Sequence, residues 1–289
     1  MYEFHSDPRK YTHDETVSEL GKALTWLEQD LGLRIVNTRI QNYQNILNER
    51  ETLKEPEEYK NYLLTKKEVD EFLIIYRAFE SEPKENILKQ IKFVISGLPY
   101  RQDSAPEKPD PARDYLHELS IAARLKLAGI SVETSEDCDV VARYDHKIIY
   151  IECKRVRSKS KILPRVKDAN KQIINRMGLR KSAAYGYITI DVTDLLDIGK
   201  KIEEYNSIEH FRAYSKLRLA AFSKDYGASI RSSVHKKVCA VVFYAHILGV
   251  IVSPNRQLYN VGVFYSLGAE GDSQEKMLLN MKFQPHLCS

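Results

Sequence analysis

Apolar residues in the first third of the chain recur every three or four positions, which is the spacing of one face of an α-helix. In the segment 16–33 this pattern is carried by Val17, Leu20, Leu24, Leu27 and Leu31. The segments 69–79 and 87–95 repeat it. Residues 1–100 are therefore predicted to be mainly helical, and their sequence contains no motif to which a chemistry can be assigned.

The pattern changes after a proline-rich segment, 98–113, that is typical of an exposed linker. Asp110 and Pro111 form a good helix start and Gly129 a good helix stop, which predicts a helix over 111–128. Short runs of β-branched residues separated by polar turns follow this helix. They predict strands at 130–134, 140–143 and 148–151.

A second helix is predicted between Pro164 and Gly178, and a further strand at 184–192. The last third adds an expected helix at 208–222 and buried strands at 238–252 and 259–265. This alternation predicts an α/β fold. We expect two domains, a mainly helical region at 1–105 and an α/β domain at 106–289.

The composition is that of a soluble globular protein. The chain has 289 residues, 43% of them hydrophobic, and 44 Lys and Arg against 40 Asp and Glu give a formal charge of only +4. Its longest apolar run, 238–252, is shorter than the roughly 20 residues that cross a bilayer, and 1–10 lacks the apolar core of a secretory signal. The four cysteines are too scattered for a disulfide framework, so a reducing, cytoplasmic compartment is expected.

The positive charge is concentrated in one segment. Residues 152–181 contain eleven Lys and Arg but only two acidic residues, Glu152 and Asp168, whereas the rest of the chain is acidic. Such a concentration is typical of a surface that contacts the phosphate backbone of a nucleic acid, although a solvated helix face is an equally good interpretation of the charge alone. Residues 1–100 carry 18 acidic and 14 basic residues and suit contact with a protein partner better.

Candidate chemistry lies on a hairpin beside this basic segment. Glu152 and Lys154 are two residues apart at the end of an apolar strand, so their side chains share one face. If the hairpin turns through Asp145 and His146, Asp139 lies directly opposite Glu152. Opposed residues of an antiparallel pair have Cβ atoms about 5 Å apart, close enough for two carboxylates to bind one divalent ion.

Two more acidic residues could join this group. Glu118 shares a helical stripe with Tyr115, Ala122 and Leu125, which should face the sheet, and a carboxylate in an apolar stripe suggests a role. Asp137 would share a face with Asp139 and could replace or assist it as a ligand.

These residues resemble the PD-(D/E)XK nuclease superfamily, whose core is a helix carrying Glu, three antiparallel strands, a helix and a further strand. The matching residues are Glu118, Asp139 and Glu152-Cys153-Lys154, and the resemblance covers about 110–192. It implies a restriction-endonuclease-like fold, a mixed central sheet flanked by helices. Cys138 stands where the family often has Pro, and Gln172 is followed by Arg176 where a subset has Tyr.

The resemblance also implies roles. Asp139, Glu152 and the backbone carbonyl of Cys153 would bind Mg²⁺ or Mn²⁺, and Lys154 would position or deprotonate the attacking water and stabilise charge on the phosphate. Glu118 would orient a water or help to hold a second ion. The residues expected to contact nucleic acid, with DNA the favoured substrate, are Arg155, Arg157, Lys159, Lys161, Arg165, Lys171 and Gln172.

Family habit further implies an endonuclease of a bacterial antiviral defence or restriction system, with a separately encoded helicase or ATPase as partner, because the sequence has no nucleotide-binding P-loop. A homodimer is also open. The alternative to an enzyme is a non-catalytic nucleic-acid-binding or scaffold subunit that keeps a nuclease-like fold.

Overall fold

The computed structural model divides the chain into two compact units. The described residues up to Ala123 form an N-terminal helical unit, and those from Arg124 form a C-terminal unit built on a sheet. The structure describes residues 12–50, 56–101, 108–134, 138–178, 184–196, 203–252, 257–268 and 273–288. The domain boundary expected near residue 105 lies outside these ranges. The two units divide between Ala123 and Arg124, within the helix predicted over 111–128.

The N-terminal unit is helical, as its apolar spacing predicts. Its helices are α1 (His13–Thr25), continued by a π-helical turn (Trp26–Asp30), α2 (Arg39–Asn48), α3 (Pro56–Phe79), α4 (Leu88–Val94) and α5 (Pro111–Leu127). Helix α1 begins with a capping box, in which the Thr12 side chain accepts from the Glu15 backbone and the Glu15 carboxylate accepts from the Thr12 backbone. The C-terminal end of α5 lies beyond Ala123 and so belongs to the other unit.

A buried ionic cluster holds the N-terminal unit together. The Glu68 carboxylate on α3 forms ion pairs with Arg39 (3.0 Å) and Arg113 (3.2 Å), and all three side chains are buried. The arginines are also fixed by the main chain, since Arg39 donates to the carbonyl of Val94 (2.7 Å) and Arg113 to that of Pro99 (2.8 Å). Buried charges are tolerated when they are paired and fully hydrogen-bonded, so this cluster fixes three helices to the 94–99 segment.

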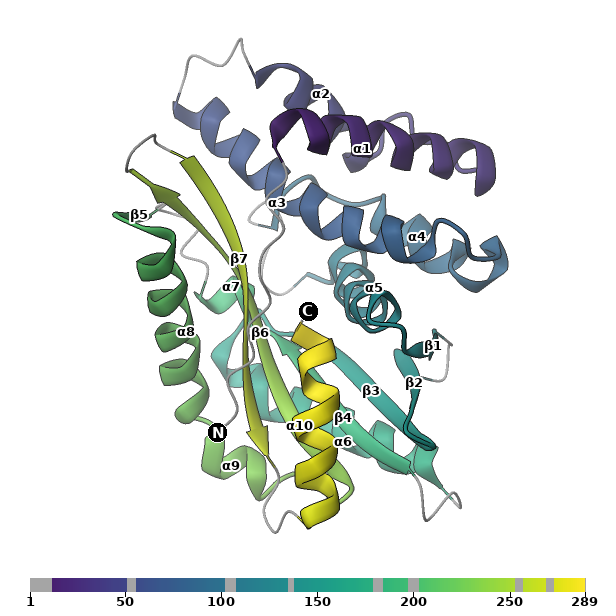
Figure 1. Cartoon of the computed structure of the whole chain (residues 1–289), viewed down its shortest axis with the longest axis vertical. Coiled ribbons are helices and arrows are strands. Elements are labelled where there is room, and N and C mark those ends of the chain that lie inside the picture. Colours follow the sequence, from purple (N-terminus) through teal and green to yellow (C-terminus); the bar gives the residue numbers. More distant parts are fainter. Residues whose placement is uncertain are drawn as a thin grey trace. The chain divides into compact units, whose positions relative to one another are not determined.

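The C-terminal unit is α/β, with a seven-stranded mixed sheet. The strand order is β1-β2-β3-β4-β6-β5, and β7 pairs with the free edge of β6 (Figure 1). Strands β1 to β3 are antiparallel, β4 is parallel to β3 and to β6, and β7 is antiparallel to β6. The strands are β1 (Ser131–Glu133), β2 (Val140–Tyr144), β3 (Lys147–Arg155), β4 (Ala184–Asp191), β5 (Glu203–Tyr205), β6 (Val238–Ile251) and β7 (Gln257–Gly268).

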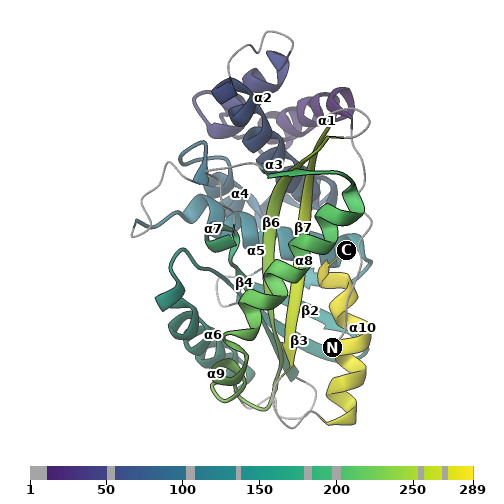
Figure 2. The ribbon, with the colours of Figure 1, turned by 90° about the vertical axis from the view of Figure 1, so that its left-hand side faces the viewer.

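The helices of this unit lie on both faces of the sheet. Gly186 on β4 faces α6 (Ile162–Met177), and a Cβ atom there would come within 2.7 Å of Ile173, so glycine permits the close approach of that helix. The next residue, Tyr187, faces the other way and donates to Asn280 of α10 (Gln274–Cys288). Figure 2 shows α6 and α10 on opposite sides of the strands. The remaining helices are α7 (Thr193–Leu196), α8 (Ile208–Lys224) and α9 (Gly227–Arg231).

The helices and strands predicted for the central region are all present, in the predicted order. The β2–β3 register is also the expected one, since Val140 pairs with Ile151 and Tyr144 with Lys147. Asp145 and His146 both have positive φ, 49° and 60°, as the two central residues of a type I′ turn require. Within the described residues, no helix has the length and apolar character needed to cross a membrane.

Candidate active site on β2 and β3

Three of the predicted site residues meet at one point of the sheet. The Lys154 Nζ atom donates to Glu152 Oε2 at 2.8 Å and to Asp139 Oδ2 at 3.2 Å. Glu152 is buried, and the side chains of Lys154 and Asp139 are 15% and 18% exposed. One ammonium group therefore joins both carboxylates, and the cluster reaches solvent through Lys154 and Asp139.

The face on which this cluster lies follows from the parallel register. Glu152 is level with Ile188, and Lys154 with Ile190. Both isoleucines belong to the same face as Gly186, which is the face covered by α6. The carboxylate and the amine therefore project from β3 toward the basic helix, as their i and i+2 spacing predicts.

Asp139 is held in place by the main chain of β3. It lies just before β2, and its Oδ2 atom accepts the backbone N–H of Cys153 at 2.7 Å. The N–H and C=O of one strand residue point to the same neighbour, so the Cys153 carbonyl points to the edge where Asp139 lies. The adjacent Cys138 thiol is buried, and this burial raises its pKa to about 11, so it is not poised as a nucleophile.

Arg176 is a fourth member of the cluster. Its Nη1 atom forms an ion pair with Glu152 Oε1, so the two oxygens of Glu152 contact two different cations. Arg176 was not among the predicted site residues; it stands where a subset of the nuclease superfamily has Tyr. One feature of the sequence could have indicated this contact. Arg176 follows Gln172 by four residues, so both lie on the same flank of α6, the one that faces β3.

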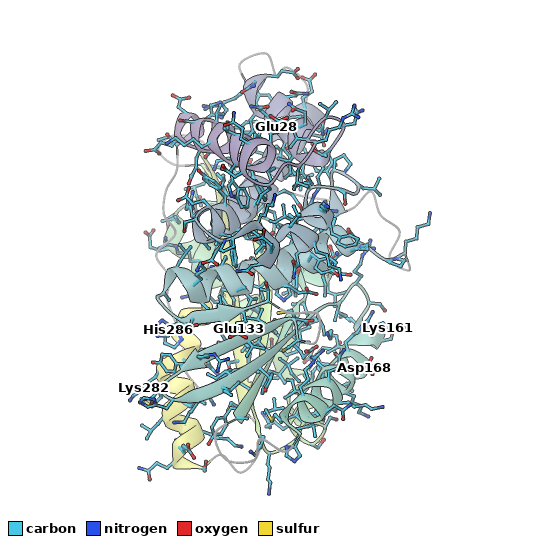
Figure 3. The ribbon with its side chains drawn as sticks, turned by 90° about the vertical axis from the view of Figure 1, so that its right-hand side faces the viewer. Glu28, Glu133, Lys161, Asp168, Lys282 and His286 are labelled. Carbon is cyan, nitrogen blue, oxygen red and sulfur yellow. The ribbon has the colours of Figure 1, made fainter. Side chains whose placement is uncertain are left out.

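The predicted nucleic-acid contacts divide into two groups. Arg155 is buried, and its Nε atom donates to Asp194 Oδ2 at 3.1 Å, while Arg157 lies 3.8 Å from the same oxygen. Arg155 was expected to contact nucleic acid, but its guanidinium is buried and paired with Asp194, so it joins β3 to α7 instead. The others are exposed, as expected for a phosphate-contacting surface: Lys159, Lys161, Arg165, Lys171 and Gln172. Lys161 and Asp168 are labelled in Figure 3 at this side of the unit.

Two further predicted residues are not among the described residues of the C-terminal unit. Glu118 is half-buried on α5 in the N-terminal unit, whereas Asp139, Glu152 and Lys154 belong to the C-terminal unit. Of its stripe, Ala122 and Leu125 are buried as expected, and Tyr115 stacks on Phe93 of α4. Asp137 lies outside the described residues.

The donor atoms suit a hard cation. No group of three or more His, Cys, Asp and Glu side chains within the described ranges converges to hold a metal ion. Mg²⁺ needs no such group, because it is usually bound through one or two carboxylates and keeps several waters. Asp139 Oδ2 and Glu152 Oε2 converge on one ammonium, so these two oxygens can share a single cation.

No family model, curated protein or solved structure matches the chain.

Proposed function

We propose that the protein is a metal-dependent nuclease that hydrolyses phosphodiester bonds, with DNA as its substrate. The observation that carries the proposal is the convergence of Asp139, Glu152 and Lys154 on the face of the sheet covered by a basic helix. A largely buried cluster of acidic and basic side chains with some members exposed to solvent is typical of an active site. The order of helices and strands around them supports a restriction-endonuclease-like fold for the C-terminal unit.

Asp139 and Glu152, with the Cys153 carbonyl, would hold Mg²⁺ or Mn²⁺. When bound, the metal would lower the pKa of a water and neutralise charge that develops on the phosphate. The Lys154 ammonium, which here donates to Glu152 and Asp139, would turn toward a phosphate oxygen or the attacking water when the ion takes its place between the two carboxylates. The Cys153 N–H keeps the Asp139 carboxylate aimed at this point.

Cleavage of plasmid DNA in the presence of Mg²⁺ tests the proposal. Glu152→Ala and Lys154→Ala are expected to abolish cleavage, because each removes a group that contacts the metal or the reacting phosphate. Glu133→Ala and Lys282→Ala are controls of matched charge, since both residues are exposed, on β1 and α10, and neither contacts the cluster in the ion pairs described above (both are labelled in Figure 3). Thermal unfolding of each variant shows whether it is folded. Equal cleavage by folded wild type, Glu152→Ala and Lys154→Ala would refute the proposal.

One observation favours a second candidate, a non-catalytic nucleic-acid-binding or scaffold subunit. Arg176 and Lys154 together balance the charges of Asp139 and Glu152, so the cluster is neutral without a metal. Titration with Mn²⁺ separates the two candidates. A nuclease binds the ion through Asp139 and Glu152, whereas a subunit stabilised by Arg176 binds DNA but no Mn²⁺.

A further inference from the structure

A second basic feature lies beside α6, in the turn that leads into β6. The backbone N–H of His235 donates to Asn170 Oδ1 on α6 at 2.8 Å. The carbonyl of Lys237 accepts the N–H of Gly186 at 2.9 Å, which joins the same turn to β4. The backbone of the turn is therefore fixed to both the helix and the sheet.

Positive charge gathers at this turn from several segments. Lys167 and Lys171 are exposed on α6, and His235 and Lys236 are exposed on the turn. Partial burial and the charges of Lys236, Lys237 and Lys276 lower the pKa of His235, so the positive charge of this turn comes from the lysines rather than from the ring. We call the residues Lys167, Lys171, His235, Lys236 and Lys237 the α6–turn surface.

This surface lies across α6 from the Asp139–Glu152–Lys154 cluster. At about 100° per residue, Asn170 and Lys167 fall on one flank of the helix and Gln172 and Arg176 on the other. Asn170 contacts the turn and Arg176 contacts Glu152, so the contacts agree with this division. Lys171 lies between the two flanks, on the outer side of the helix.

We propose that the α6–turn surface binds the phosphate backbone of the substrate beyond the bond that is hydrolysed. This inference rests on the proposed nuclease function and adds a second contact region to it. Clustered amines that face solvent are the groups that neutralise phosphates and release counterions. A membrane surface fits less well, because none of the large exposed hydrophobic side chains among the described residues lies on α6 or on the segment 232–237.

The distance between Lys154 and the α6–turn surface sets a minimum length for a substrate that contacts both. Lys154 is level with Ile190 on β4, and the turn is bonded to β4 at Gly186, which is four residues or about 13 Å away along the strand. At about 3.4 Å per nucleotide along one strand, this corresponds to roughly four nucleotides. Substrates that extend beyond the scissile bond by more than this length gain the additional contacts, and shorter ones do not.

The test measures binding of a labelled duplex of about 30 base pairs by fluorescence anisotropy, without divalent ions so that no cleavage occurs. The test variant is Lys167→Gln/Lys171→Gln/Lys236→Gln. The control is Lys92→Gln/Lys224→Gln/Lys282→Gln, which removes the same charge from other exposed positions. The test variant is expected to weaken binding about 10- to 100-fold and to reduce the dependence of log K on log salt by up to about 3.

Three outcomes decide the inference. The inference is overturned if the test variant binds the duplex as tightly as the control variant does. It is also overturned if the test variant loses only its binding to phosphatidylserine vesicles. Cleavage of a short duplex that reaches only the Lys154 site is expected to be equal in the two variants, while cleavage of the long duplex falls in the test variant alone. If wild type cleaves nothing but the binding difference is found, the proposed nuclease function fails while the phosphate-binding surface stands.

Discussion

Each unit of the molecule contains a buried glutamate among cationic side chains, but the two clusters differ in whether the cationic partners are exposed to solvent. Glu68 is paired with arginines that are themselves buried and bonded to backbone carbonyls. Glu152 is also buried, but its partners are Arg176 and Lys154, whose side chains are 21% and 15% exposed. The first cluster is closed inside the helical unit, and the second continues to the surface.

This difference separates a structural role from a chemical one. A buried carboxylate with cationic partners is not by itself a sign of chemistry, because such a pair also fixes helices in one arrangement. What distinguishes the Glu152 cluster is that solvent can reach some of its members. Lys154 and Asp139 are the reachable members, so their removal should change activity more than stability, and the reverse should hold for the Glu68 cluster.

The largest expected effect is the loss of activity in Lys154→Met. We expect cleavage of DNA to fall by about 1000-fold or more, because the variant loses the charge next to the phosphate. Its resistance to urea should change little, since the Lys154 side chain reaches the surface. Arg113→Met is the matched variant of the other cluster and should lose stability instead. A Lys154→Met protein with wild-type cleavage would remove the distinction between the clusters.

The next effect compares the two glutamates by urea unfolding. Glu68→Gln is expected to destabilise the protein by about 3–5 kcal/mol, because buried Arg39 loses its carboxylate partner and buried Arg113 keeps only Asp110. Glu152→Gln is expected to cost less, about 1–2 kcal/mol, because Arg176 and Lys154 can turn toward water. Equal losses for both variants would indicate that the Glu152 cluster is closed as well.

A smaller effect is expected for Arg176→Gln. Glu152 Oε1 then loses its ionic partner and the carboxylate is less firmly oriented, so kcat should fall about 10- to 100-fold while KM for DNA stays near the wild-type value. Arg176→Lys should restore most of the activity. A variant that loses stability but keeps kcat, or that is not rescued by lysine, would assign Arg176 a purely structural role.

The smallest effect concerns acid stability. Burial would raise the pKa of Glu68, but Arg113, Arg39 and Arg101 outweigh it and lower the pKa below its ordinary value of 4.5. The carboxylate therefore stabilises the fold fully above that value, and the contribution is lost as the pH falls through the lower folded value. We expect unfolding experiments to show a stability that falls as the pH drops below about 5 and continues to fall through the lowered pKa of Glu68.

A control variant isolates this contribution. Glu68→Gln should flatten the acid limb of the stability curve, while Glu85→Gln, at an exposed position, should leave it unchanged. An acid limb of the same slope in Glu68→Gln would show that other carboxylates cause the loss.

Local patterns were sufficient for the central hairpin and its neighbours. The turn at Asp145 and His146 sets the register, and the strand period places Glu152 and Lys154 on one face. The same reasoning did not find α10, because this helix carries exposed apolar residues such as Met277 and Met281 as well as a buried face. Its sequence therefore lacks the one-sided periodicity that predicts a surface helix.

Contacts between distant segments were beyond the reach of such patterns. The sequence specified the strands, the hairpin register and the face that Glu152 and Lys154 share, because backbone geometry repeats over two or four residues. It did not specify that Arg176 pairs with Glu152, that Asp194 binds Arg155, or that Asn170 anchors the turn at His235. The contacts of Arg176 and Asn170 form when α6 packs against the sheet, and that of Asp194 when α7 follows β4 to the end of β3. Packing of whole elements, unlike local periodicity, is decided by the entire chain at once.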